Sequence, residues 1–147
     1  MKTKKYLIVI PLLFSIVLSV NCGTECDPYL PGSVPGIELS NVPPLGSSNN
    51  LGGRINGVDP DDYRIAVYIF VPVTGGWWNK PTFASPLTIP DCTSFFSCDI
   101  TTGGEDETAT KIRAYLVPKD YNPPLVSGGS IPQSIELNSA AWKEVSR

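Results

Sequence analysis

The chain has 147 residues, of which 41% are hydrophobic, and it carries 11 basic against 14 acidic side chains and no histidine. The acidic balance argues against nucleic acid as a partner, because nucleic acid requires a basic face. The absence of histidine excludes Ser-His and Cys-His nucleophile arrangements and the commonest general base near neutral pH. We therefore expect a protein that is not an enzyme and that has no catalytic residue and no cofactor.

Residues 1–21 have the layout of a bacterial secretory signal, in which a basic start precedes an apolar run. Three lysines are followed by an uncharged stretch from Tyr6 to Val20. This stretch is shorter than the about 20 residues that a membrane span requires, so a signal peptide is favoured over a retained anchor helix. Its removal takes away three lysines and leaves 8 basic and 14 acidic side chains, a net charge of −6.

The cleavage zone "LSVNC" resembles the lipobox of bacterial lipoproteins, in which the cysteine becomes the lipid-bearing first residue. Asn21 departs from the small residue that usually precedes this cysteine. The resemblance implies lipidation at Cys22 and a membrane-anchored protein of the outer membrane or cell surface; the alternative is a secreted protein. The lipid would be the only contact with the membrane.

The other cysteines of an exported protein are expected to form disulfides. Cys92 and Cys98 flank "TSFFS", a spacing that predicts a disulfide closing a local loop. Cys26 then has no partner if Cys22 is lipidated, whereas Cys22 and Cys26 are free to pair if it is not.

Residues 22–36 are rich in glycine and proline and predict a lipidated N-terminus with a flexible tether. Residues 37–147 are expected to form one β-sandwich domain of ordinary size. Short runs of β-branched and aromatic residues between glycines and prolines predict about seven strands, so the expected fold is all-β, a single immunoglobulin-like antiparallel sandwich. The expected strands are Leu51–Val58, Tyr63–Val73, Trp77–Lys80, Leu87–Ile89, Ser97–Thr102, Lys111–Pro118 and Trp142–Val145, and one short segment near the end, "SIELNSAAWK", has helical character.

Alternation along the two clearest strands divides their side chains between two faces. Ile65, Val67, Ile69 and Val71 share one face with the aliphatic set of the second strand, and this face is expected to form the core. The other face would then display an aromatic and guanidinium surface made of Arg64, Tyr68, Phe70, Arg113 and Tyr115. The same alternation sends one of Trp77 and Trp78 inward and the other outward, and Trp78 is favoured inward.

Three stretches of the chain resemble a bacterial extracellular module that is found alone in secreted proteins and lipoproteins and beside glycoside hydrolases. They are "GRINGVDPDDYRIAVYIFVPVTGGWWNKPTFASPLTIPDC", "CDITTGGEDETATKIRAYLVPKDYNPP" and the tail "SIPQSIELNSAAWKEVSR". One departure is the loop after Asp91, where "CTSFFSC" replaces the usual Asp-Gly hairpin. The resemblance implies a β-sandwich without an established catalytic residue, and its neighbours imply association with carbohydrate.

Exposed aromatic side chains on a secreted protein suggest a sugar site, because the flat faces of pyranose rings stack on tryptophan and tyrosine. An extracellular polysaccharide is therefore the favoured partner; the alternative is an envelope protein that packs on the same surface. The candidate ligand-binding residues are Trp77, Trp78, Tyr68, Phe70 and Tyr115, with Arg64, Arg113 and Lys80 as partners for hydroxyl groups.

The acidic segment "DITTGGEDE" is the one place that suggests a metal. Asp99, Glu105, Asp106 and Glu107 could supply oxygen ligands to Ca²⁺. Their spacing matches no EF-hand, and a solvated acidic turn explains the same residues, so no metal site is expected.

Overall fold

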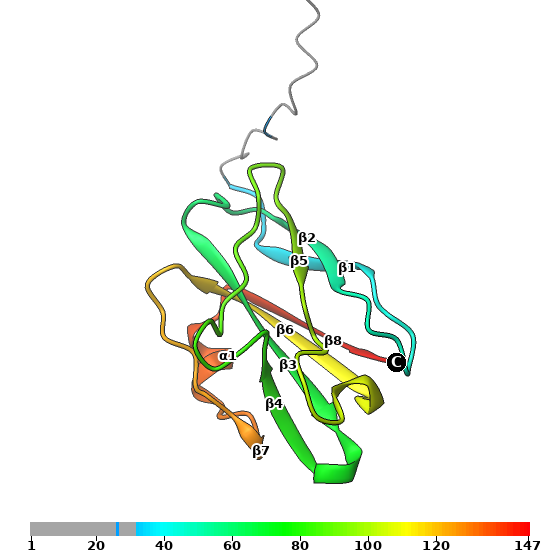
Figure 1. Cartoon of the computed structure of the whole chain (residues 1–147). Helices are drawn as coiled ribbons and strands as arrows, with labels where there is room; N and C mark the ends of the chain where they lie inside the picture. Colours follow the sequence, from blue (N-terminus) through cyan, green and yellow to red (C-terminus); the bar gives the residue numbers. More distant parts are fainter. Residues whose placement is uncertain (1–25, 27–31) are drawn as a thin grey trace, which may run out of the picture.

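The structure, a computed structural model, describes Cys26 and residues 32–147 (Figure 1). The expected signal peptide of residues 1–21 and the expected lipidation site Cys22 lie outside the described residues. The elements in chain order are β1 (Gly36–Asn41), β2 (Leu51–Asn56), β3 (Tyr63–Val71), η1 (Pro72–Thr74), β4 (Gly76–Lys80), β5 (Phe95–Cys98), η2 (Asp106–Thr108), β6 (Lys111–Pro118), β7 (Ser127–Gly129), α1 (Ser134–Asn138) and β8 (Ala141–Ser146).

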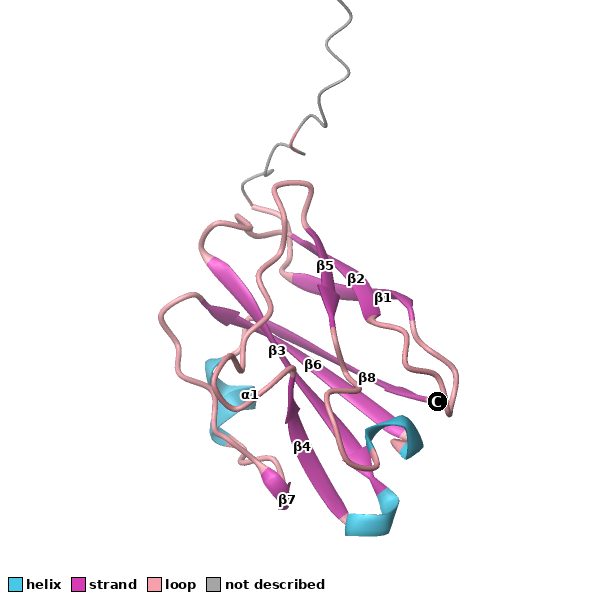
Figure 2. Cartoon of the chain, viewed as in Figure 1, coloured by secondary structure: helices cyan, strands magenta, loops and turns pink. Residues whose placement is uncertain are grey.

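Two antiparallel sheets face each other, which confirms the predicted all-β sandwich (Figure 2). The smaller sheet has the order β1-β2-β5, and the larger one has the order β7-β4-β3-β6-β8. Strands β3 and β6 form the centre of the larger sheet along a continuous register from Tyr63 opposite Pro118 to Phe70 opposite Lys111. In the described part of the chain, no helix is long and apolar enough to cross a membrane.

The core between the sheets follows the predicted alternation. Ile65, Val67 and Ile69 of β3 are fully buried there with Ile112, Ala114 and Leu116 of β6, and β2 and β5 close the core with Leu51, Ile55 and Phe96. Each large aliphatic side chain that is removed from water in this way contributes about 1.5–3 kcal/mol to folding. The strict period of two therefore sets which face of β3 enters the core.

The opposite face of the larger sheet is also covered, and this corrects the prediction of an exposed aromatic surface. Tyr68 and Tyr115 are both 0% exposed and pack with Ala66, Val117 and other side chains in a second apolar cluster. The segment after β6 folds back over this face, and it supplies Val126 and Ile135 to the cluster. The Tyr68 hydroxyl donates to the carbonyl of Pro124 at 2.8 Å, so the buried phenol is satisfied by the covering segment.

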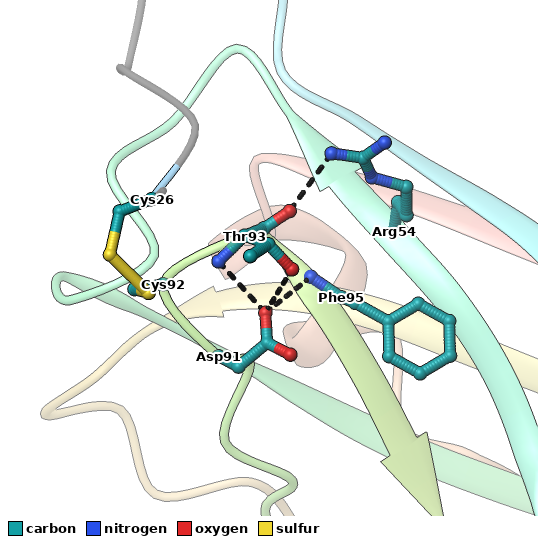
Figure 3. The surroundings of a disulfide bond; sticks show 6 residues. All are labelled: Cys26, Arg54, Asp91, Cys92, Thr93 and Phe95. Atoms are coloured by element: carbon teal, nitrogen blue, oxygen red, sulfur yellow. Dashed lines mark hydrogen bonds between the residues drawn. A yellow bond between two sulfur atoms is a disulfide. The ribbon is translucent and has the colours of Figure 1, made fainter. Parts of the chain in front are cut away.

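The cysteine pairing predicted from the sequence is wrong. Cys92 is bonded to Cys26 (Figure 3). Cys98 is a free thiol that is 1% exposed. Cys98 alternates with exposed Ser97 in β5 and therefore points into the core, where burial raises the pKa of its thiol to about 11. Cys92 precedes the strand, in an exposed turn.

The turn that carries Cys92 is organised by a single carboxylate. Asp91 Oδ1 accepts hydrogen bonds from the backbone N–H of Thr93 at 2.9 Å, the hydroxyl of Thr93 at 2.7 Å and the N–H of Phe95 at 3.1 Å (Figure 3). The Thr93 hydrogen bond lowers the pKa of Asp91. Arg54 of β2 donates to the Thr93 carbonyl at 2.9 Å, which joins the turn to the smaller sheet.

The remaining differences from the sequence concern short or edge elements. Strands β1 and β7 were not expected, and the expected strand Leu87–Ile89 is one isolated bridge between Ile65 and Thr88. The expected strand Ser97–Thr102 lies earlier, at β5, because Asp99 accepts a hydrogen bond from the Thr101 N–H at 2.9 Å and turns the chain. These segments contain few residues, so neighbouring strands and turns decide their conformation.

Candidate functional site

A cleft of about 310 Å³ opens beside the inner face of β4, at the end of the sandwich where β3 finishes. It lies at the small end of the range for ligand sites, about 300–1,000 Å³. Its walls come from the end of β3, from η1, from β4 and from the loop before η2; the lining residues are Val71, Thr74, Trp78, Lys80, Thr102, Gly103, Gly104, Glu105 and Asp106. An aromatic ring, a cation and two carboxylates therefore share one concave surface.

Trp78 is the aromatic wall of this cleft, and two contacts fix its position. It lies on the face of β4 that packs against the core between the sheets, as the alternation predicted. Its Nε1–H donates to Thr74 Oγ1 of η1 at 2.9 Å. The ring also lies against Gly128 of β7, where an added Cβ would be 3.3 Å from Trp78 Cζ2. The indole is thus held before any ligand arrives, and preorganisation of this kind favours binding.

Lys80 and Asp106 form a buried ion pair at the side of the cleft. Their side chains are 8% and 9% exposed. The Lys80 ammonium donates to Asp106 Oδ2 and, at 3.0 Å, to Thr102 Oγ1, while Asp106 Oδ2 also accepts from the Gly103 N–H at 3.0 Å. Within the described residues, the third ammonium proton and Asp106 Oδ1 have no hydrogen-bond partner. Both residues line the cleft, so a hydrogen-bond donor and an acceptor belong to its wall.

A smaller cavity of about 210 Å³ adjoins the cleft across the Gly103–Gly104 backbone. It shares Gly103, Gly104 and Asp106 with the cleft and adds Ser48, Thr101 and Glu107. Two exposed carboxylates thus flank the glycine pair, Glu105 on the side of the cleft and Glu107 on the side of the smaller cavity. The loop is acidic on both sides, and Lys80, the one lysine among the described residues that line the two cavities, is already paired with Asp106.

The four residues considered for Ca²⁺ do not converge. Asp99 Oδ1 accepts from the N–H of Thr101, and Asp106 is occupied by Lys80, whereas Glu105 and Glu107 line different cavities. Among residues 26 and 32–147, no group of three or more acidic, cysteine or histidine side chains is placed to hold a metal ion.

The outer face of the larger sheet keeps one half-exposed aromatic strip, made of Phe70, Trp77, Arg113 and Trp142. The Arg113 guanidinium lies between two indoles, with its carbon 5.0 Å from the Trp77 ring centre and 5.2 Å from that of Trp142. Phe70 contacts Trp77 edge to face, with ring centres 5.5 Å apart. Trp142 is 48% exposed and was not among the candidates from the sequence.

Arg113 was predicted to bind ligand hydroxyls, but the protein itself occupies its donors. It donates to the Glu144 carboxylate, to the Tyr115 hydroxyl at 3.2 Å and to Glu136 of α1 at 3.4 Å. The guanidinium therefore links β6, β8 and α1. The main role of the strip is therefore structural, because its charged hydrogen bonds hold these elements together.

The candidate residues consequently separate into four places. Trp78 and Lys80 line the cleft; Phe70, Trp77 and Arg113 lie in the outer strip; Tyr68 and Tyr115 are buried. Arg64 lies at the beginning of β3 and donates to backbone carbonyls of Pro60, Asp61 and Tyr63. Sequence reasoning did not identify Thr74 and Thr102 as site residues. Their only signal in the sequence is position, since Thr74 lies shortly before Trp78 and Thr102 directly precedes the Gly103–Gly104 pair.

Comparisons with protein-family models, with curated proteins and with solved structures found no match to this chain. A rigid indole beside a buried donor and acceptor suits a ligand that has an apolar face and a hydroxylated edge.

Proposed function

We propose that this protein is a non-catalytic carbohydrate-binding module of the bacterial envelope that receives a sugar ring against Trp78 in the cleft. The observation that carries the proposal is the combination in one cavity of the fixed Trp78 ring with the Lys80–Asp106 pair. In this proposal Cys22 bears a lipid that anchors the chain to the outer membrane or cell surface.

The chemistry of a pyranose matches the two parts of the cleft. Its C–H faces are apolar and stack on an indole, which is a large apolar surface with a polar edge. Its hydroxyl groups both donate and accept hydrogen bonds, and adjacent hydroxyls can meet the free Lys80 proton and Asp106 Oδ1 together. Hydrogen bonds to charged partners contribute about 1.5–3 kcal/mol each, so these two groups would fix the orientation of the ring.

Two features of the sequence support the same function. The N-terminal segment has the pattern of an exported lipoprotein, which would bring the domain into contact with extracellular glycans. The chain also resembles modules that occur beside glycoside hydrolases.

We place no catalytic step at the cleft. The two-carboxylate chemistry of glycosidases needs one carboxylic acid and one free carboxylate on either side of the scissile bond. Asp106 is paired with Lys80 and with the Gly103 N–H, and the nearest other carboxylate, Glu105, is exposed on the rim.

Binding can be tested by titrating the full chain, in a detergent without a sugar headgroup, against cellulose, β-glucan, xylan, chitin and peptidoglycan fragments. Tryptophan emission and calorimetry would report binding. We expect Trp78→Ala to weaken binding by roughly 5- to 150-fold, since stacking of a flat ring on an aromatic side chain, as measured for nucleic-acid bases, is worth roughly 1–3 kcal/mol. Trp142→Ala is the matched control, because it removes a half-exposed indole outside the cleft.

Loss of binding in Trp142→Ala with retention in Trp78→Ala would contradict the placement of the sugar in the cleft. Absence of binding to every glycan would contradict the function. The anchor has a separate test, because a Cys22→Ala protein that still partitions into detergent would show that no lipid at this residue holds it.

The second candidate function is a protein-interaction module of the envelope that has no sugar ligand. It is favoured by exposed apolar side chains on the outer side, namely Trp142 at 48% and Leu137 of α1 at 79% exposure. Large exposed apolar residues mark contact surfaces when they gather in one patch. In that case Trp142→Ala would abolish capture by an envelope partner, and Trp78→Ala would leave it intact.

A further inference from the structure

If the cleft binds a glycan, as proposed above, the charges around it influence which glycan it accepts. The inference below rests on that proposed function. Lys80 is the only basic residue that lines either the cleft or the adjoining cavity in the described part of the chain. Its charge is compensated at once by Asp106, and the pair is almost completely removed from solvent. The described lining of the cleft therefore has no uncompensated positive charge for an acidic ligand.

The carboxylates, in contrast, are not compensated. Glu105 lines the cleft and Glu107 lines the adjoining cavity, and both residues are exposed. Their backbone carbonyls accept hydrogen bonds, from Thr108 and Gly46 respectively, but among the described residues neither side-chain carboxylate has an ion-pair or hydrogen-bond partner. Two exposed carboxylates without a described ion-pair partner thus lie next to the glycine pair.

We propose that the cleft selects saccharides by charge, favouring units that carry a protonated amino group over neutral units and neutral units over acidic ones. A protonated amine beside Glu105 would gain the attraction of the carboxylate and the cation–π attraction of the Trp78 face. A uronic acid in the same position would meet Glu105 and Glu107 without a cation to balance it. Like charges about 6 Å apart repel by an energy equivalent to about a threefold change in affinity in bulk water and about a hundredfold change at the effective dielectric constant of a protein surface, and roughly tenfold lies between these limits.

The test uses three oligosaccharides that share one ring type and differ only in charge: oligomers of glucosamine, glucose and glucuronic acid. Affinities of the full chain are measured by calorimetry at mildly acidic pH, where the amine of the glucosamine oligomer is protonated and the carboxyl group of the glucuronic acid oligomer is ionised. We expect the affinities to fall in the order glucosamine, glucose, glucuronic acid, by roughly tenfold at each step at low salt. High salt should bring the three values together, because it screens exposed charges.

Variants assign the selection to the two carboxylates. Glu105→Gln should reduce the ratio of glucosamine to glucuronic acid affinity by roughly tenfold, and adding Glu107→Gln should reduce it further, with glucose affinity nearly unchanged. Asp61→Asn is the matched control, since it also replaces an exposed carboxylate by an amide. Asp61 precedes β3, whose nine residues span about 27 Å from there to Val71 at the cleft, which is beyond the Debye length of about 10 Å at 0.1 M salt.

The outcomes separate this inference from the proposed function. Binding that is lost in Trp78→Ala but shows no charge order, or an order that Glu105→Gln leaves unchanged, would overturn the charge selection and leave the sugar site in place. Tighter binding of the glucuronic acid oligomer would overturn the selection as well. Absence of binding to all three oligomers, together with the polysaccharide panel, would overturn both.

Discussion

Trp77 and Trp78 are adjacent in the chain but belong to different apolar layers. Trp78 packs against the core between the sheets, and Trp77 packs against the cluster on the opposite face, where its ring contacts Phe70 and the Arg113 guanidinium. The alternation of side chains in β4 is the cause. Each tryptophan is half-buried, so each presents part of its ring, one to the cleft and one to the outer strip.

The position of Trp78 depends on the missing side chain of Gly128. Gly128 has φ 82°, and an added Cβ would be 3.3 Å from Trp78 Cζ2. We expect Gly128→Ala to cost about 1 kcal/mol in backbone strain and also to displace the indole, which would shift tryptophan emission and weaken glycan binding. Gly46→Ala is the matched control, because Gly46 has φ 79° and no atom within 4 Å of the added Cβ. Equal effects of both variants on emission and binding would contradict this role of Gly128.

The buried Lys80–Asp106 pair predicts a strong coupling between two substitutions. Lys80→Met should lower the free energy of unfolding by about 3–5 kcal/mol, because it leaves a buried carboxylate without its partner. Lys80→Met combined with Asp106→Asn should recover much of that loss, since the amide oxygen can still accept from Gly103.

Urea unfolding measures this coupling, and an exposed pair gives the comparison. Lys119 donates to Asp62 at 2.7 Å, with side chains that are 46% and 59% exposed. Lys119→Met should change the free energy of unfolding by only about 0–1 kcal/mol. Additive effects of the Lys80 and Asp106 substitutions would show that the pair is not coupled.

The Cys26–Cys92 disulfide should contribute more to the free energy of unfolding than the free thiol of Cys98. Cys26 and Cys92 are 66 positions apart, and the chain entropy of a loop this long corresponds to about 4 kcal/mol. We therefore expect Cys26→Ala with Cys92→Ala to lower the free energy of unfolding by up to that amount. Cys98→Ala should cost only about 1 kcal/mol, for one lost buried atom.

Peptide mapping without reduction checks the same assignment directly. A peptide that joins Cys26 to Cys92 is expected, and Cys98 should react with an alkylating reagent only after unfolding, because its thiol is buried. A cross-linked peptide that contains Cys92 and Cys98 would contradict the structure.

We expect the turn that is organised by Asp91 to become less ordered at acidic pH. The hydrogen bond from Thr93 lowers the pKa of Asp91 below its ordinary 3.8, so the carboxylate is stabilised in the folded protein. The contribution to stability is complete above the ordinary pKa and is lost as the pH falls through the lower, folded value. Faster exchange of the Thr93 and Phe95 amides should accompany protonation, as seen by NMR. In Asp91→Asn the exchange of these amides should show no such acid transition beyond the intrinsic pH dependence.

The sandwich could be predicted because its two central strands are long and strictly periodic. The nine residues of β3 and the eight of β6 alternate long enough between the two faces of the sheet to predict both the extended conformation and the face that enters the core. The candidate site was predicted only in part. Trp78 and Lys80 were predicted from their residue types. Their neighbours Thr102 and Asp106 lie in a loop more than twenty positions away from Lys80, so the sequence did not indicate this contact.

The sequence alone determined the period-two pattern of β3, β4 and β6, and with it the separation of Trp77 from Trp78. Tertiary structure decided what each face meets. The segment after β6 folds over the outer face and buries Tyr68 and Tyr115, and a turn fixed by Asp91 presents Cys92 to Cys26 while β5 turns Cys98 inward. Periodicity is a local property of a strand, but coverage and pairing depend on distant segments that no local pattern specifies.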